Sequence, residues 1–111
     1  MAHMKTIVVV EEFYPRPKWR YRSEGDGSGE AFREELLAPA LRDNNEVKVD
    51  LTGYNRYGPS FVSEAFGGLI RNEGFSFEEL EKKLKIVHER LPSFVGVCWE
   101  EIGKAHRESI K

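Results

Sequence analysis

The sequence predicts an α/β domain with a mixed β-sheet of about four strands packed with three main helices. Segments with the two-residue periodicity of strands alternate along the chain with segments whose apolar residues recur every three or four positions. No internal repeat or second core is visible. A length of 111 residues fits one domain, which we expect to occupy residues 4–111. Right-handed crossovers would join its parallel strand pairs.

Composition points to an ordinary globular domain. Apolar residues make up 40% of the chain and charged residues 32%, and the net charge of -2 gives no overall attraction to nucleic acid or anionic membranes. One cysteine, Cys98, excludes an internal disulfide framework. No apolar run approaches the roughly 20 residues that span a bilayer, so we expect a cytoplasmic protein. Residues 1–3 have the form of an expression scar and are excluded from functional interpretation.

Four segments have the pattern of strands. Residues 7–10 are a β-branched run, which is typical of a buried strand. Residues 18–22 alternate cationic and aromatic side chains, which predicts a second strand. Residues 47–51 alternate apolar and polar, and residues 84–87 are predicted as the fourth strand. The glycine-rich residues 25–29 form a flexible connector in this scheme.

Three longer segments have the pattern of amphipathic helices. The first covers residues 30–42, where Pro39 should produce a kink or a break because proline lacks an amide donor. The second covers residues 60–72 and contains Gly67 and Gly68, an unusual pair whose expected compensation is the close approach of another backbone. The third begins at about residue 92.

The stretch between the third strand and the second helix is the most informative part of the sequence. Asp50-Leu51-Thr52 ends a strand, and Gly58-Pro59-Ser60-Phe61 leads into a helix for which Ser60 is the expected N-cap. A helix N-terminus is also a favourable place for a phosphate. With residues 28–33 before it, this arrangement resembles the centre of STAS domains, the anti-sigma-factor-antagonist fold. It is most similar to the prokaryotic STAS-like domains of unknown function, over residues 7–107.

The resemblance implies a non-catalytic regulatory domain that binds a partner protein. In regulatory STAS domains, the loop after the strand carries a serine or threonine that a partner kinase phosphorylates. Ser60 is the hydroxyl at that place, whereas Gly58 and Pro59 replace the acidic residue and the first hydroxyl. Ser60 is therefore the phosphoacceptor candidate, and its alternative role is a plain cap that contributes about 1 kcal/mol. The resemblance also implies a histidine-kinase-like ATPase as partner.

The residues around Ser60 are the predicted partner-binding surface. Tyrosine and arginine are favoured as interface anchors, and a carboxylate one turn after Ser60 would lie beside the switch. The alternatives are packing of the aromatic side chains under the loop and interaction of the carboxylate with the helix dipole. The predicted partner-binding residues are Tyr54, Arg56, Tyr57, Ser63 and Glu64.

A second hypothesis is an anion-binding or nucleic-acid-binding module. In a regular strand, the cations of the basic segment share one face, and Trp19 or Tyr21 could stack on bases. The acidic helix that follows and the negative net charge argue against nucleic acid, and a solvated sheet edge is the plainer interpretation. The predicted anion-binding residues are Arg16, Lys18, Arg20 and Arg22.

The spacing of potential catalytic and ligating residues suggests no catalytic set. His88 and His106 are too far apart for a local metal motif, and residues 25–29 lack the pattern of a phosphate-binding loop. We therefore expect no enzyme activity, no cofactor and no metal. A small enzyme whose site is assembled only in three dimensions is the third hypothesis. The pattern does not predict an oligomeric state.

Overall fold

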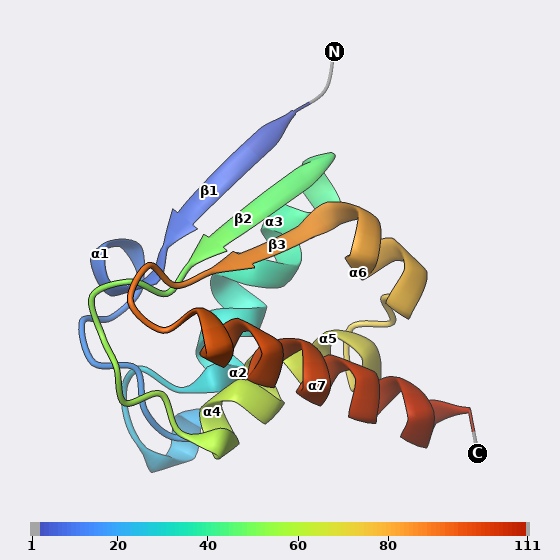
Figure 1. The fold of residues 1–111 in the computed structure, drawn as a ribbon. Helices are drawn as coiled ribbons and strands as arrows, with labels where there is room; N and C mark the ends of the chain where they lie inside the picture. Colours follow the sequence, from blue (N-terminus) through green and yellow to red (C-terminus); the bar gives the residue numbers. More distant parts are fainter. Residues whose placement is uncertain (1–2, 111) are drawn as a thin grey trace.

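The computed structural model describes residues 3–110 and contains a three-stranded parallel sheet in the order β1-β2-β3 (Figure 1). The strands are β1 Met4–Val8, β2 Glu46–Asp50 and β3 Leu84–Val87. Residues 1 and 2 of the proposed expression scar lie outside the described residues. No helix among residues 3–110 combines the length and the apolarity needed to cross a bilayer.

Helices follow each strand, which confirms the α/β class. They gather on one side of the sheet (Figure 1), where Val47, Val49 and Leu84 are buried, whereas Lys48 and Lys85 on the other face are exposed. The helical elements are α1 Val9–Glu12, η1 Arg22–Glu24, α2 Gly29–Phe32, η2 Arg33–Leu37, α3 Ala38–Asp43, α4 Pro59–Val62, η3 Ser63–Gly67, α5 Gly68–Arg71, α6 Phe77–Lys83 and α7 Pro92–Ser109.

Two of the predicted long helices each contain a wide π turn in the middle. The helix of residues 29–43 passes through η2, where the amide of Ala38 donates to the carbonyl of Arg33. Of the kink or break predicted at Pro39, the break does not occur, because the wider turn just before the proline lets the helix continue. The helix of residues 59–71 has the same construction around η3, where the amide of Gly68 donates to the carbonyl of Ser63.

The predicted strand at residues 18–22 is wrong. The chain there runs along the glycine-rich connector: the amide of Lys18 donates to the carbonyl of Gly27, and the amide of Gly29 donates to the carbonyl of Trp19. Trp19 has a positive φ of 74°, which no strand residue adopts. Local backbone partners therefore replace a sheet neighbour. As a result the described sheet has three strands instead of four and is parallel instead of mixed.

The other boundaries differ less from the predictions. β1 begins earlier than expected, and Val9 and Val10 turn into the short helix α1. Apart from the short turn η1, residues 3–110 therefore contain five helices. Two are short, α1 and α6, and three are long as predicted, at residues 29–43, 59–71 and 92–109.

Cys98 on α7 is fully buried, and burial raises the pKa of its thiol to about 12, as suits a small apolar residue.

Candidate functional site

Ser60 lies at the beginning of a helix but does not cap it. Gly58 is the N-cap residue and Pro59 occupies the first helical position, for which its fixed φ is suited. The predicted N-cap role of Ser60 is therefore wrong, since the observed N-cap lies two residues before it. Its hydroxyl is exposed and lies 3.5 Å from Nη2 of Arg20, which donates to it. The hydroxyl is thus available for chemistry that a capping bond would hinder.

A pocket of about 470 Å³ surrounds this hydroxyl, and we name it the Ser60 pocket. It brings together residues from the predicted partner-binding set and from the predicted anion-binding set. Three cations face one carboxylate, Glu24, whose Oε1 already accepts hydrogen bonds from the amides of Arg20 and Tyr21. The pocket is therefore electropositive. Its lining residues are Lys18, Trp19, Arg20, Glu24, Tyr54, Arg56, Gly58, Pro59, Ser60 and Phe61.

The basic segment does not present one shared cationic face, because it is not a strand. Arg22 turns away from the Ser60 pocket and pairs with Glu34, at 2.9 Å from Nη2 to Oε1, and with Glu35. Hydrogen bonds to Glu35 and Glu34 raise the pKa of Arg22. Arg16 lines a separate hollow beside Trp19. Only Lys18 and Arg20 of the predicted anion-binding set face Ser60.

The two tyrosines of the preceding loop have different environments. Tyr57 is buried and stacks on Phe94, with ring centroids 5.6 Å apart, while its hydroxyl donates to the carbonyl of Leu51. Burial raises the pKa of Tyr57. Tyr54 is half-buried and lines the Ser60 pocket, and its carbonyl lies 2.9 Å from Nε2 of His88. The structure thus places Tyr57 in the packing under the loop and Tyr54 at the surface.

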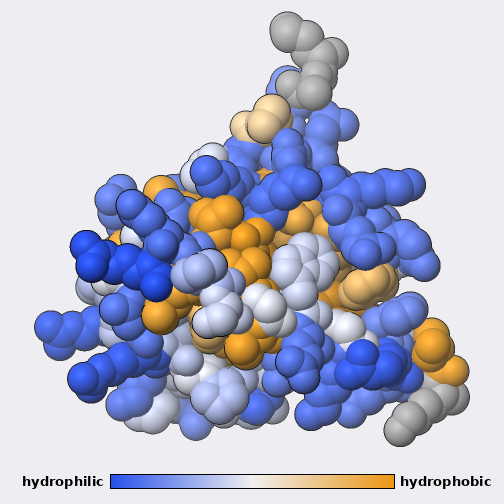
Figure 2. Space-filling view, in the orientation of Figure 1, coloured by the Kyte–Doolittle hydropathy of each residue, from blue (hydrophilic) through white to orange (hydrophobic). Residues whose placement is uncertain are grey.

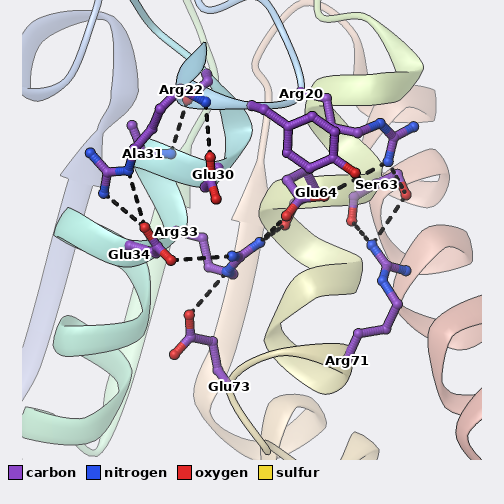
Figure 3. A network of polar contacts seen from close by, with 12 residues as sticks. Arg20, Arg22, Glu30, Ala31, Arg33, Glu34, Ser63, Glu64, Arg71 and Glu73 are labelled. Atoms are coloured by element: carbon purple, nitrogen blue, oxygen red, sulfur yellow. Dashed lines mark hydrogen bonds and ion pairs between the residues drawn. The ribbon is translucent and has the colours of Figure 1, made fainter. Parts of the chain in front are cut away.

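Glu64 belongs to a buried network that the sequence did not predict (Figure 3). Arg33, only 2% exposed, donates through Nη1 to Oε2 of Glu64 at 2.8 Å and to the Glu64 carbonyl at 2.6 Å. Its Nε donates to Glu73 at 3.0 Å, and Arg42 pairs with the other oxygen of Glu73 at 2.7 Å. The Arg33–Glu64 ion pair therefore joins the two π turns, η2 and η3.

Gly67 and Gly68 make room for arginine side chains in this network. A Cβ atom at residue 68 would lie 2.2 Å from Nη1 of Arg33, and one at residue 67 would lie 2.7 Å from Nη1 of Arg71. The predicted compensation, close approach of another backbone, is wrong for both residues. The glycine pair nevertheless indicated from the sequence that this face of the helix leaves space for neighbouring side chains, which are those of Arg33 and Arg71.

The network continues from the interior to the Ser60 pocket. Arg20 lies 3.8 Å from Oε1 of Glu64 through Nη1, and the same atom donates to the hydroxyl of Ser63 at 3.4 Å. Arg71 donates to the Ser63 carbonyl at 2.7 Å. A groove of about 540 Å³ lies beside these residues, lined by Tyr21, Glu30, Arg33, Glu34, Glu64, Arg71, Asn72 and Glu73.

The pKa of Glu73 predicts that the network is weakened by acid. Burial would raise the pKa of this carboxyl, but hydrogen bonds from Arg42 and Arg33 outweigh burial and hold it below the ordinary 4.5. The unfolded chain therefore takes up the proton first as the pH falls. The stabilisation is complete above about pH 5 and is lost as the pH falls through the folded-state pKa.

We expect the stability difference between the wild type and Glu73→Gln to be largest near neutral pH and to shrink in acid. Urea unfolding at several pH values measures this difference. Glu108→Gln, at an exposed residue of α7, should differ little from the wild type at every pH. A difference for Glu73→Gln that is constant with pH would contradict the assignment.

An apolar groove elsewhere contains none of the predicted site residues. Figure 2 shows apolar side chains at the middle of the face on which β3 lies near α7, ringed by hydrophilic residues. The groove measures about 320 Å³ and is lined by Glu81, Leu84, Lys85, Ile86, Val87 and Trp99. Within residues 3–110, no group of three His, Cys, Asp or Glu side chains is placed to hold a metal ion.

Comparison with known proteins finds one matching family model. The family model described as STAS-like domain of unknown function (DUF4325) matches residues 28–105, which include the helix that begins beside Ser60 and the buried residues Arg33 and Glu64, but not Arg20. No curated protein and no solved structure matches the chain. Since the matched region covers well over half of the sequence, the chain belongs to the family of STAS-like domains of unknown function.

Proposed function

We propose that this domain is a non-catalytic, cytoplasmic regulatory module that binds a partner protein through the surface around the Ser60 pocket, and that phosphorylation of Ser60 modulates binding. One observation carries the proposal. The Ser60 hydroxyl is exposed in the first turn of a helix, makes no capping bond and lies beside Lys18, Arg20 and Arg56. By family resemblance, the partner is a histidine-kinase-like ATPase.

The surroundings of Ser60 favour a phosphoserine. A phosphate adds roughly -1.5 to -2 charges and three acceptor oxygens, and a helix N-terminus stabilises such a charge. Arg20 already contacts the hydroxyl and is only partly committed to Glu64, at 3.8 Å. A phosphate would therefore draw Arg20 towards residue 60, while Glu64 keeps its shorter pair with Arg33. The local surface charge would change without loss of the fold.

The chain contains a matched control for Ser60. The tetrapeptide Pro-Ser-Phe-Val begins α4 at residue 59 and also begins α7 at residue 92. Ser93 has the same local sequence and the same helix position, and it is exposed, but it does not line the Ser60 pocket. A difference between the two serines would therefore reflect the cations of the pocket and not the helix start.

We expect partner capture from the native host, read by mass spectrometry, to find phosphate on Ser60 and none on Ser93. Ser60→Ala should abolish the modification and change the free energy of unfolding by less than about 0.5 kcal/mol, because no capping bond is lost. Ser60→Glu should weaken partner binding, whereas Ser93→Glu should not. Wild-type binding by both Ser60 variants would leave the switch without support.

Binding of a nucleic acid or another anion is a second candidate, favoured by the aromatic walls of the same pocket. Trp19 is 38% exposed and lines the pocket together with Tyr54, so a base could stack beside its cations. Such binding should weaken steeply with salt. A gel shift with single-stranded oligonucleotides at low and moderate salt measures it, and no shift at either salt would eliminate this function.

A further inference from the structure

Two arginines from distant parts of the chain converge on one hydroxyl. Arg20 precedes η1, and Arg71 ends α5. Nη1 of Arg20 lies 3.4 Å from Oγ of Ser63, and Nη2 of Arg71 lies 3.3 Å from the same atom. Figure 3 shows both guanidinium groups directed towards Ser63 from opposite sides. The hydroxyl oxygen of Ser63 therefore lies between two positively charged guanidinium groups.

Both guanidinium groups are held in place before any ligand arrives. Arg71 donates to the Ser63 carbonyl at 2.7 Å and folds over Gly67, where a Cβ atom would lie 2.7 Å from its Nη1. Arg20 is positioned by longer contacts, at 3.4 Å from Ser63, 3.5 Å from Ser60 and 3.8 Å from Glu64. Side chains that are already ordered lose little conformational freedom on binding, which favours affinity.

The surroundings leave Arg20 and Arg71 only weakly neutralised. Arg20 lies 3.8 Å from Glu64, which keeps a shorter pair with Arg33 at 2.8 Å, and Glu73 pairs with Arg33 and Arg42. In the described part of the chain, the polar partners of Arg71 are the carbonyl and the hydroxyl of Ser63, and neither carries a charge. The pair can therefore accept a negatively charged group without breaking the buried ion pair.

We propose that Arg20 and Arg71 form a recognition site for a carboxylate in an acidic segment of the partner protein. The inference rests on the proposed function, since it specifies the partner at the same surface. A planar guanidinium matches the two oxygens of a carboxylate, which would take the place that Oγ of Ser63 now holds between the arginines. Glu30, Glu34, Glu64 and Glu73 line the adjoining groove and would repel a phosphate dianion more than a carboxylate.

The site predicts whether phosphorylation of Ser60 strengthens or weakens binding of the acidic segment. Arg20 contacts both Ser60 and Ser63, so a phosphate on Ser60 and a carboxylate at Ser63 compete for one guanidinium group. Phosphorylation therefore weakens binding of the acidic segment. The same competition explains why glutamate at residue 60 should weaken partner binding although the fold is intact.

The probe is an N-acetylated octaglutamate peptide titrated into the ¹⁵N-labelled protein at low salt. We expect saturable shifts of the side-chain Nε–Hε signals of Arg20 and Arg71. Arg20→Gln or Arg71→Gln should weaken binding roughly tenfold or more, as loss of charged hydrogen bonds implies. Arg107→Gln is the matched control, because Arg107 likewise lies over a helical glycine four residues earlier, Gly103, and should change binding less than about twofold.

Two further measurements test whether the ligand group is a carboxylate bound by planar guanidinium groups. Arg71→Lys keeps the charge but loses the planar fork, so wild-type affinity in that variant would overturn the recognition geometry. A peptide with one phosphoserine that binds more tightly than the same peptide with one glutamate at that position would overturn the assignment to a carboxylate. Shifts that are spread over other cations, or that persist in both glutamine variants, would overturn the site.

The outcome is separable from that of the proposed function. No octaglutamate binding, with partner capture that still responds to Ser60→Glu, would reject the carboxylate site and leave the switch intact. Binding at Arg20 and Arg71, with partner capture indifferent to residue 60, would reject the switch and keep the site.

Discussion

Arg33→Met is expected to destabilise the domain by about 3–5 kcal/mol, because it leaves the buried Glu64 without its close cation and Glu73 with Arg42 alone. Arg33 is 2% exposed and bonds both Glu64 and Glu73, and Glu64 is itself buried. Methionine fills a similar volume but cannot solvate a charge. Urea unfolding followed by circular dichroism measures the loss, which is large compared with the total stability of a domain of this size.

Arg22→Met is the matched control for this prediction. Arg22 also pairs with two glutamates, Glu34 and Glu35, but all three side chains are well exposed. Exposed ion pairs contribute little, because water screens them and both side chains must be ordered. Arg22→Met should therefore cost much less than Arg33→Met. Equal losses in the two variants would show that burial does not set the strength of the Arg33 network.

A double variant distinguishes the loss of the Arg33–Glu64 ion pair from the cost of leaving the Glu64 carboxylate buried without its partner. Arg33→Met combined with Glu64→Met removes the buried carboxylate together with its partner, and should recover part of the stability lost in Arg33→Met alone. Glu73 keeps Arg42 in both variants. A double variant less stable than Arg33→Met would mean that Glu64 stabilises the domain through its other contacts, such as Arg20.

Sequence periodicity predicted the elements whose neighbours are set by burial. The alternation at residues 47–51 and the segment at residues 84–87 correspond to β2 and β3, because the buried faces of these strands admit only apolar side chains. The alternation at residues 18–22 predicted a strand that does not exist. Its aromatic residues Trp19 and Tyr21 are exposed, so no buried face supported the pattern.

The candidate site was predictable only in part. Ser60 and its loop could be found because a turn, a proline and a hydroxyl at a helix start are local features. Arg33 could not be found, since a buried arginine has the same sequence appearance as a surface one. Its partner Glu64 is 31 residues away in the sequence, and only the glycines at 67 and 68 indicated that a side chain packs against this face of the helix.

Gly29→Ala is expected to destabilise the domain by about 1–3 kcal/mol, the usual cost of overpacking. A Cβ atom at residue 29 would lie 2.6 Å from the backbone carbonyl oxygen of Phe61 and 3.1 Å from the amide nitrogen of Ala65. Backbone atoms of a helix cannot move aside as the end of a side chain can. The helix of residues 29–43 would have to shift away from η3, and the shift would also disturb Arg33 against Glu64.

Gly96→Ala shows what the same substitution does where space allows it. Gly96 lies inside α7, and an added Cβ atom there would meet nothing within 4 Å. Alanine should therefore stabilise the domain by about 0.5–1 kcal/mol through its better helix propensity. Thermal unfolding of the two variants should move in opposite directions from the wild type. If Gly29→Ala were neutral or stabilising, the close contact between the two π-containing helices would not be the constraint that aligns Arg33 with Glu64.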